Sequence, residues 1–156
     1  MELKEAKSFE EYQLVAELFK EYAAQIGHDL AFQNFNEELQ KIESHYSPPG
    51  GSIFIAYNEE GTPVGCFGIR KLDSSICELK RTYLKKEFRG LGIGNLLLRK
   101  AIEVARELGY QKMRLDTLPT MDSAIKLYEK TGFYKIEPYR FNPIEGALYY
   151  EFKLSG

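Results

Sequence analysis

The sequence predicts an α/β fold with one mixed, mostly antiparallel sheet, and three observations carry that prediction. Three β-rich segments follow one another between residues 52 and 84, with only short turns between them. A glycine-rich turn at residues 90–94 then leads into a segment with helical periodicity, and an apolar strand segment follows it. Strand, helix and strand in that order form a crossover between parallel neighbours, so one parallel pair is expected.

The first 50 residues should contribute a short strand and two helices. Leu3–Ala6 has strand character, and Ser8 with Glu11 has the spacing of a capping box before a helix that ends near Gly27. A second helix is expected over Asn34–Ser44, because the SPPGG segment that follows cannot continue regular structure.

The sheet is expected to hold six to seven strands flanked by about four helices. After the three-strand meander, apolar residues recur with helical spacing from Gly92 to Gly109, and KMRLDTL is a buried strand. A further helix is expected over residues 122–131. Two last strands are expected near residues 133–136 and 147–152. The final strand is a candidate sheet edge, which leaves both a monomer and a homodimer open.

Length and composition indicate a single domain, residues 1–156, with a substantial core. Of the 156 residues 44% are hydrophobic, and the formal net charge is −2. This charge gives no general attraction to nucleic acid, and the N-terminal segment MELKEAKSFEEYQ is too charged for a leader or a membrane anchor. Cys66 and Cys77 lack metal-ligand spacing, so neither a disulfide nor a metal site is expected. We expect a cytoplasmic protein without a membrane or nucleic-acid partner.

The segment FRGLGIGNLLL, residues 88–98, places three alternate glycines before a helix N-terminus, which suits phosphate binding. A Walker P-loop is excluded because Gly94 is followed by Asn95 rather than lysine. A dinucleotide fingerprint would use Asp116 as its ribose-binding acid, but Leu97 or Asn95 replaces its third glycine in either frame. Its strand would also begin a βαβ unit, whereas this strand ends a meander. Glycines that only permit close helix packing are the remaining alternative.

Two motifs resemble those of one enzyme family. Arg89-x-x-Gly92-x-Gly94 is similar to the Arg/Gln-x-x-Gly-x-Gly/Ala signature of the GNAT superfamily, the acyl-CoA-dependent N-acyltransferases. The segment AIKLYEKTGF, residues 124–133, resembles a second motif of that family at the usual spacing. The resemblance covers residues 52–132 most strongly. It implies a GNAT-like sheet whose parallel crossover lies at the coenzyme A site.

By this resemblance the co-substrate is acetyl-CoA, bound without a metal. The dipole of the helix after the turn favours a pyrophosphate, and the strand before the turn pairs with the pantetheine arm through its main chain. Met121 replaces an asparagine that relatives often carry, which implies the loss of one polar contact to the cofactor or to a neighbouring strand. Arg89 supports the turn or else caps it from the surface. The residues expected to bind are Thr82, Tyr83, Leu84, Arg89, Gly90, Gly92, Ile93, Gly94 and Asn95.

Acetyl transfer to an amine requires a base for the amine and a proton for the departing thiolate. A lysine-like amine has a pKa of about 10.4, so at neutral pH it must first lose a proton. The resemblance makes Tyr128 the general acid, with a purely structural core tyrosine as the alternative. Glu78 stands at the offset from Arg89 that matches the general base of histone-acetylating relatives. A salt-bridged Glu78, with another carboxylate or a water chain as the base, is the alternative.

The acceptor is expected to be a small-molecule primary amine, amino-acid-like rather than a protein. It would enter between the N-terminal helices and the C-terminal edge of the sheet, beside residues 27–32 and 139–147. The second segment could equally form an ordinary β-arch. A non-catalytic acyl-CoA-binding or regulatory module and a peptide N-acetyltransferase are the rival functions. A tyrosine and a carboxylate at the expected catalytic positions favour an enzyme.

Overall fold

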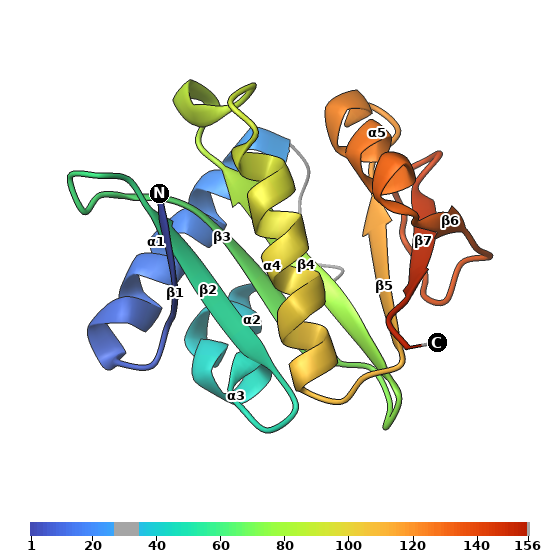
Figure 1. The fold of residues 1–156 in the computed structure, drawn as a ribbon, viewed down its shortest axis with the longest axis horizontal. Coiled ribbons are helices and arrows are strands. Elements are labelled where there is room, and N and C mark those ends of the chain that lie inside the picture. The colour runs from blue at the N-terminus through green and yellow to red at the C-terminus, as the bar shows by residue number, and fades with distance from the viewer. Residues whose placement is uncertain (27–34, 156) are drawn as a thin grey trace.

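The computed structural model describes residues 1–26 and 35–155 (Figure 1). Its centre is a seven-stranded sheet formed by β1 (Glu2–Glu5), β2 (Ser52–Tyr57), β3 (Pro63–Lys71), β4 (Ile76–Leu84), β5 (Lys112–Thr117), β6 (Tyr134–Lys135) and β7 (Leu148–Lys153). The strand order is β1-β2-β3-β4-β5-β7-β6. Among the strands of the described residues only β4 and β5 pair in parallel, so the predicted meander and the predicted crossover are both confirmed.

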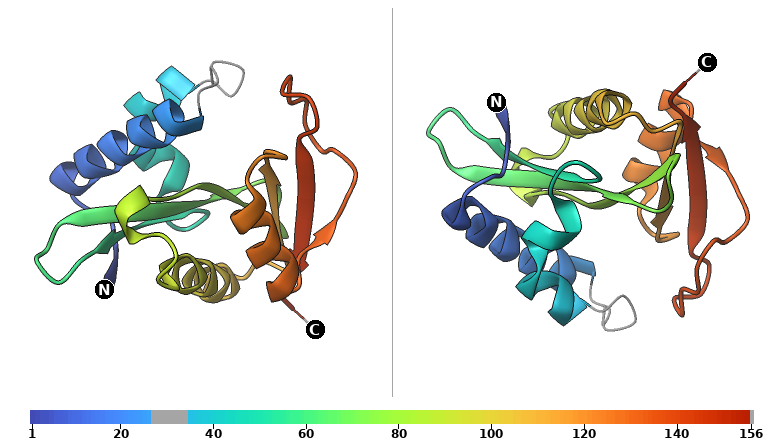
Figure 2. Two further views of the ribbon diagram at one scale, coloured as in Figure 1. Left: turned by 90° about the horizontal axis from the view of Figure 1, so that it is seen from above. Right: turned by 90° about the horizontal axis from the view of Figure 1, so that it is seen from below.

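Helices cover both faces of this sheet, as the two views of Figure 2 show. One face carries α1 (Phe9–Ile26), α2 (Phe35–Gln40) and α3 (Ile42–Tyr46). The other carries α4 (Ile93–Glu107) and α5 (Asp122–Thr131), and a 3₁₀ turn at Lys86–Phe88 precedes α4. None of the helices in the described ranges is long and apolar enough to cross a membrane.

Local sequence signals explain the two longest helices. The predicted capping box begins α1: the Glu11 carboxylate accepts a bond from the Ser8 N–H at 2.9 Å, and the Ser8 hydroxyl accepts one from the Glu11 N–H at 3.1 Å. Helix α4 buries a stripe of apolar residues at helical spacing against β3 and β4. That stripe is formed by Leu97, Leu98, Ala101, Ile102 and Ala105.

The single helix expected over Asn34–Ser44 is wrong, because the described part of that segment forms the two short helices α2 and α3. Lys41 interrupts them with φ of −125° and ψ of 36°. The break allows the Tyr46 hydroxyl to donate to the Glu38 carboxylate at 2.6 Å. A tertiary contact thus overrides a continuous local helix signal.

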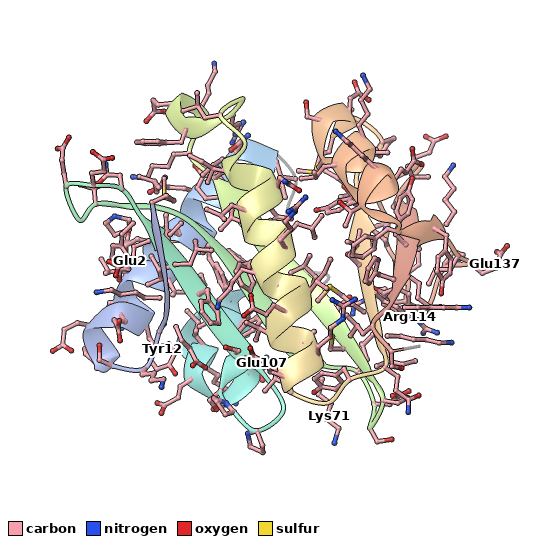
Figure 3. All side chains as sticks on the ribbon, viewed as in Figure 1. Glu2, Tyr12, Lys71, Glu107, Arg114 and Glu137 are labelled. Carbon is pink, nitrogen blue, oxygen red and sulfur yellow. The ribbon has the colours of Figure 1, made fainter. Side chains whose placement is uncertain are left out.

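Strand β7 is not the sheet edge that we expected, because it lies between β5 and β6. Its buried Glu151 accepts hydrogen bonds from Arg114 of β5, at 2.8 Å, and from the Tyr134 hydroxyl of β6. Arg114 is labelled in Figure 3. A buried carboxylate needs such partners, and here it ties the three strands together. The edge on this side is therefore the two-residue strand β6.

Strands β4 and β5 separate after a short paired stretch. Pairing ends at Glu78 opposite Arg114, although β4 continues to Leu84 and β5 to Thr117. Figure 1 shows the two strands diverging toward the top of the view. An irregular register between β3 and β4, together with a left-handed Arg81 at φ 56°, distorts β4 at this level. The β5-facing edge of β4 is therefore open where the meander meets the glycine turn.

Candidate active site

A cavity of about 550 Å³ occupies the opening between β4 and β5. Its wall combines both strands with the start of α4, with α5, with the end of α1 and with the loop before β7. Most of the predicted cofactor-binding residues meet here. Those on the wall are Thr82, Tyr83, Leu84, Arg89, Gly90 and Gly94, while Gly92, Ile93 and Asn95 belong to the same turn and helix start.

The glycine turn has a backbone that side chains disfavour. Gly90 and Gly92 lie at φ +79° and +81°, in the left-handed region. A Cβ atom on either would meet no described atom within 4 Å, so close packing does not explain these two glycines. At Gly94 a Cβ would lie 3.6 Å from Leu127, which is ordinary van der Waals contact. The turn therefore requires glycine for its conformation, and its free side is open.

The start of α4 offers unpaired N–H groups beside this turn. Gly92 is the N-cap residue, and no described side chain caps the helix. The N–H groups of Ile93, Gly94 and Asn95 consequently have no intrahelical partner. Together with the positive end of the helix dipole, they form a site suited to a phosphate anion.

Arg89 ties the turn to β4 and to α1. Its Nε donates to the Leu84 carbonyl at 2.8 Å, and its terminal nitrogen donates to the Gln25 side chain. The guanidinium carbon lies 6.0 Å from the centre of the Tyr83 ring, whose hydroxyl donates to Glu21 at 3.2 Å. Arg89 thus lies on the cavity wall and connects the turn to β4 and α1.

Tyr128 belongs both to the core and to the cavity wall. Its side chain on α5 is buried, and its ring centre lies 5.6 Å from that of Phe133 and 6.5 Å from that of Tyr150. Burial raises the pKa of Tyr128, and the charges of Tyr22 and Asp116 add to the effect. The phenol is therefore neutral at neutral pH, and it lies on the cavity wall.

Glu78 lies in a buried cluster of charged groups. Its Oε2 accepts hydrogen bonds from the Tyr139 hydroxyl, at 2.7 Å, and from the Arg140 guanidinium, while Lys80 Nζ lies 3.9 Å from Oε1. Among the residues found to line the cavity, Lys80 is present and Glu78 is not. The structure thus brings Tyr128 to the cavity and places Glu78 behind its wall.

Sequence reasoning missed a buried ion pair under the cavity. Arg81 donates from Nε and from a terminal nitrogen to the two Glu38 oxygens, at 3.0 and 2.8 Å, and the Tyr46 hydroxyl donates to the same carboxylate. Burial raises the pKa of Glu38, but the bonds and charge of Arg81 outweigh this effect and leave it below the usual value. This ion pair holds Arg81, the residue of β4 with a left-handed backbone conformation, against α2.

Asp116 is a second group that sequence reasoning did not place here. It lies on the cavity wall, and its carboxylate accepts one hydrogen bond from Asn142 Nδ2, at 3.4 Å. Asn142 and Ile144 belong to the predicted acceptor segment 139–147 and also line the cavity. The other predicted acceptor segment, residues 27–32, lies outside the described residues. Met121 is on the wall together with Asp122 and Ser123.

Comparison with known proteins gives consistent matches. A sequence model of the acetyltransferase (GNAT) family matches residues 12–133. An uncharacterized N-acetyltransferase of Schizosaccharomyces pombe is 40% identical over 139 residues, 88% of this chain and 85% of the relative. A GNAT-family acetyltransferase structure from Staphylococcus aureus has a TM-score of 0.79 at 26% identity, over 99% of each chain. One from Elizabethkingia anophelis, solved with acetyl-CoA bound, has a TM-score of 0.57 at 24% identity, over 67% of this chain and 76% of that chain.

Proposed function

Because the chain belongs to the acetyltransferase (GNAT) family, we propose that it transfers an acetyl group from acetyl-CoA to the primary amine of a small, amino-acid-like molecule. The observation that carries the proposal is the cavity in the β4–β5 opening. The glycine turn before α4, the buried phenol of Tyr128 and the carboxylate of Asp116 all line this cavity. A binding site for the donor and groups for proton transfer thus share one space.

The donor side of the cavity fits the chemistry of coenzyme A. The pyrophosphate would bind the N–H groups of Gly90, Gly92 and residues 93–95 at the start of α4. The amide-bearing pantetheine arm would pair with the open edge of residues 82–84. Arg89 would support this arrangement from outside, through the Leu84 carbonyl.

The reaction forms a C–N bond as the amine attacks the thioester carbonyl carbon, and it breaks the C–S bond. The amine loses one proton, and the departing thiolate gains one. We assign the second proton to Tyr128, because its phenol lies on the cavity wall within the second family motif. For the base, Glu78 remains the prediction from sequence, and a carboxylate on the cavity wall is the alternative.

The acceptor side favours a small molecule. About 550 Å³ must hold the acetyl-bearing end of the donor as well as the acceptor amine. Tyr22 of α1 and Asn142 of the loop before β7 both line this space, so it is bounded on two sides. A free amine with a short side chain fits such a space better than a residue on a protein surface.

The proposal is tested with the full chain, acetyl-CoA and a panel of amines. Calorimetry should show acetyl-CoA binding to the protein alone. Thiol release should then be seen with one or more free amino acids or short alkyl amines, and more weakly with lysine-containing peptides. Binding without thiol release for any amine would support a non-catalytic acyl-CoA module, and no binding would overturn the proposal entirely.

A further inference from the structure

We propose that Asp116 binds the ammonium form of the acceptor and removes its proton, while Glu78 positions the loop on the acceptor side. The inference rests on the proposed function and assigns the residue that performs the first step of that reaction.

The position of Asp116 follows from the alternation of β5. Met113 and Leu115 point into the buried core beneath α4, so Arg114 and Asp116 point to the opposite face of the sheet. Arg114 lies at the last β4–β5 pair, and Glu151 neutralises it at 2.8 Å. Asp116 comes two residues later, where the strands have separated, and its side chain therefore reaches the cavity wall.

The Asp116 carboxylate retains capacity for a ligand. An ionised carboxylate has about four acceptor positions. Within the described chain one contact to Asp116 is found, the weak 3.4 Å bond from Asn142 Nδ2, and no ion pair. Glu78 differs, because its Oε2 already accepts from Tyr139 and Arg140. Its Oε1 has no hydrogen-bond partner in the described chain, but it lies 3.9 Å from Lys80 Nζ, and the side chain is only 1% exposed and does not line the cavity. The carboxylate presented to an entering amine is therefore that of Asp116.

Several groups face Asp116 across the cavity and the loop. Burial raises the pKa of each of the phenols named below, and the charge of Asp116 adds to that effect. The Arg140 guanidinium, whose pKa the charge of Asp116 helps to raise, is already bonded to Glu78. These groups are Tyr22 from α1, Tyr128 from α5, Tyr139 and Arg140 from the loop before β7, and Tyr149 from β7.

This arrangement separates the two proton transfers. The ammonium nitrogen gives its proton to an Asp116 oxygen, and its lone pair then forms the C–N bond at the thioester carbonyl carbon. The C–S bond breaks, and the thiolate takes a proton from the Tyr128 hydroxyl. The nitrogen, which still carries one proton too many for a neutral amide, returns that proton to the Tyr128 oxygen, and Asp116 later releases its own proton to solvent. A carboxylate base and a neutral phenol acid that line the same cavity meet both requirements. The substrate class is thus an amine that carries a positive charge in solution.

Glu78 has a different task in this account. It holds Tyr139 and Arg140, which lie in the same loop, residues 136–147, that carries Asn142 to the cavity. Loss of its charge should loosen the acceptor side of the cavity without removing the proton acceptor. Glu78 is therefore a positioning residue, and its loss should raise KM for every acceptor equally.

Asp116→Asn and Glu78→Gln separate the two roles when each is assayed with two acceptors. The first is the alkyl amine or amino acid that gives the wild-type chain its highest kcat/KM, and the second is hydroxylamine, which is uncharged at pH 7. Asp116→Asn should lower kcat/KM about 100-fold for the charged amine and less than about 10-fold for hydroxylamine. Acetyl-CoA affinity, measured by calorimetry, should stay unchanged and thereby show an intact fold. Glu78→Gln should raise KM for both acceptors to the same extent.

Asp73→Asn is the matched control, because it makes the same chemical change in the exposed turn between β3 and β4. It should alter neither acceptor's rate. Asp116→Ser serves as the second variant if the asparagine variant does not bind acetyl-CoA. Equal losses for the two acceptors in Asp116→Asn, or no loss, would overturn the inference. A wild-type chain that binds acetyl-CoA and acetylates no amine would instead contradict the proposed function.

Discussion

At the scale of one residue, Tyr128 is a core position that we propose also carries chemistry. Tyr128→Phe keeps the ring that packs on Phe133 and Tyr150 and removes only the hydroxyl. We expect kcat to fall about 100-fold because the thiolate loses its proton donor, while acetyl-CoA binding stays unchanged. Steady-state kinetics and calorimetry measure the two effects.

Tyr110→Phe is the matched control for that prediction. Tyr110 is also a buried phenol, but its hydroxyl donates to the Gly50 carbonyl and it does not line the described cavity. This variant should retain the wild-type kcat. A Tyr128→Phe enzyme with unchanged kcat would remove Tyr128 from the acid role and leave it as a core residue.

Glu38 makes stability depend on pH through its buried bond to Arg81. Its pKa is lower in the folded chain than in the unfolded chain, where it is about 4.3. The stabilisation is therefore fully present above that value and is lost as pH falls through the lower folded pKa. Glu38→Gln leaves Arg81 buried without its counter-charge and should cost about 3 kcal/mol at pH 7.

Urea unfolding between pH 7 and pH 3 tests this prediction. The stability difference between wild type and Glu38→Gln should shrink as the medium becomes acidic. Glu37→Gln, at the exposed neighbouring position that pairs with Lys41, should show almost no difference at any pH. A wild type and a Glu38→Gln variant that differ by a constant amount would contradict the account.

Motif spacing located some of these residues and could not locate others. The glycines and Tyr128 stand within short local patterns, so the sequence alone brought them into the predicted site. Arg81 and Glu38 are separated by 43 positions, and Asp116 meets Asn142 across 26. Such pairs leave no local signature. For Glu78, the spacing from Arg89 identified a candidate base, but the spacing could not show its partners Tyr139 and Arg140, which come from a loop distant in the chain.

At the scale of elements, two glycine variants distinguish the backbone conformation that the turn before α4 requires from the contact that we propose it makes with the ligand. Gly92→Ala and Gly109→Ala each put a Cβ on a left-handed residue, at φ +81° and +90°, with no described atom within 4 Å. Each should cost about 1 kcal/mol of stability. Only the Gly92 variant places a methyl group beside the uncapped start of α4, where the pyrophosphate is expected to bind.

Calorimetric titration of both glycine variants with acetyl-CoA checks this difference. The Kd should rise at least about 10-fold for Gly92→Ala, which is a loss of about 1.4 kcal/mol, and stay at the wild-type value for Gly109→Ala. Thermal unfolding should show similar losses for the two. Equal acetyl-CoA affinities would mean that the turn does not contact the donor.

Element prediction succeeded where one local period dominates. The capping box and the apolar stripes predicted α1 and α4, and the alternating or apolar runs predicted the three strands of the meander. It failed over Asn34–Ser44, where the Glu38 contacts accompany a break at Lys41. It also misplaced the sheet edge, because strand order depends on long-range pairing, which gives no local signal.

For the whole molecule, the central feature is a sheet that opens along its one parallel pair. Helices cover both faces (Figure 2), and the opening between β4 and β5 holds the cavity. The proposed donor-binding groups come from β4 and α4, and the proposed acceptor-side groups come from β5, from α1 and from the loop before β7. The fold could be predicted from sequence in this outline, whereas the acceptor-side contacts depend on segments distant in the chain.

The most direct test of the central claim follows an isotopically labelled acetyl group from acetyl-CoA to an amine on the full chain. Mass spectrometry should find one labelled acetyl group on the amine for each free CoA released, and no labelled acetyl group on the protein. Free CoA without acetylated amine, or a labelled protein that does not pass its acetyl group on, would contradict direct transfer in the β4–β5 cavity.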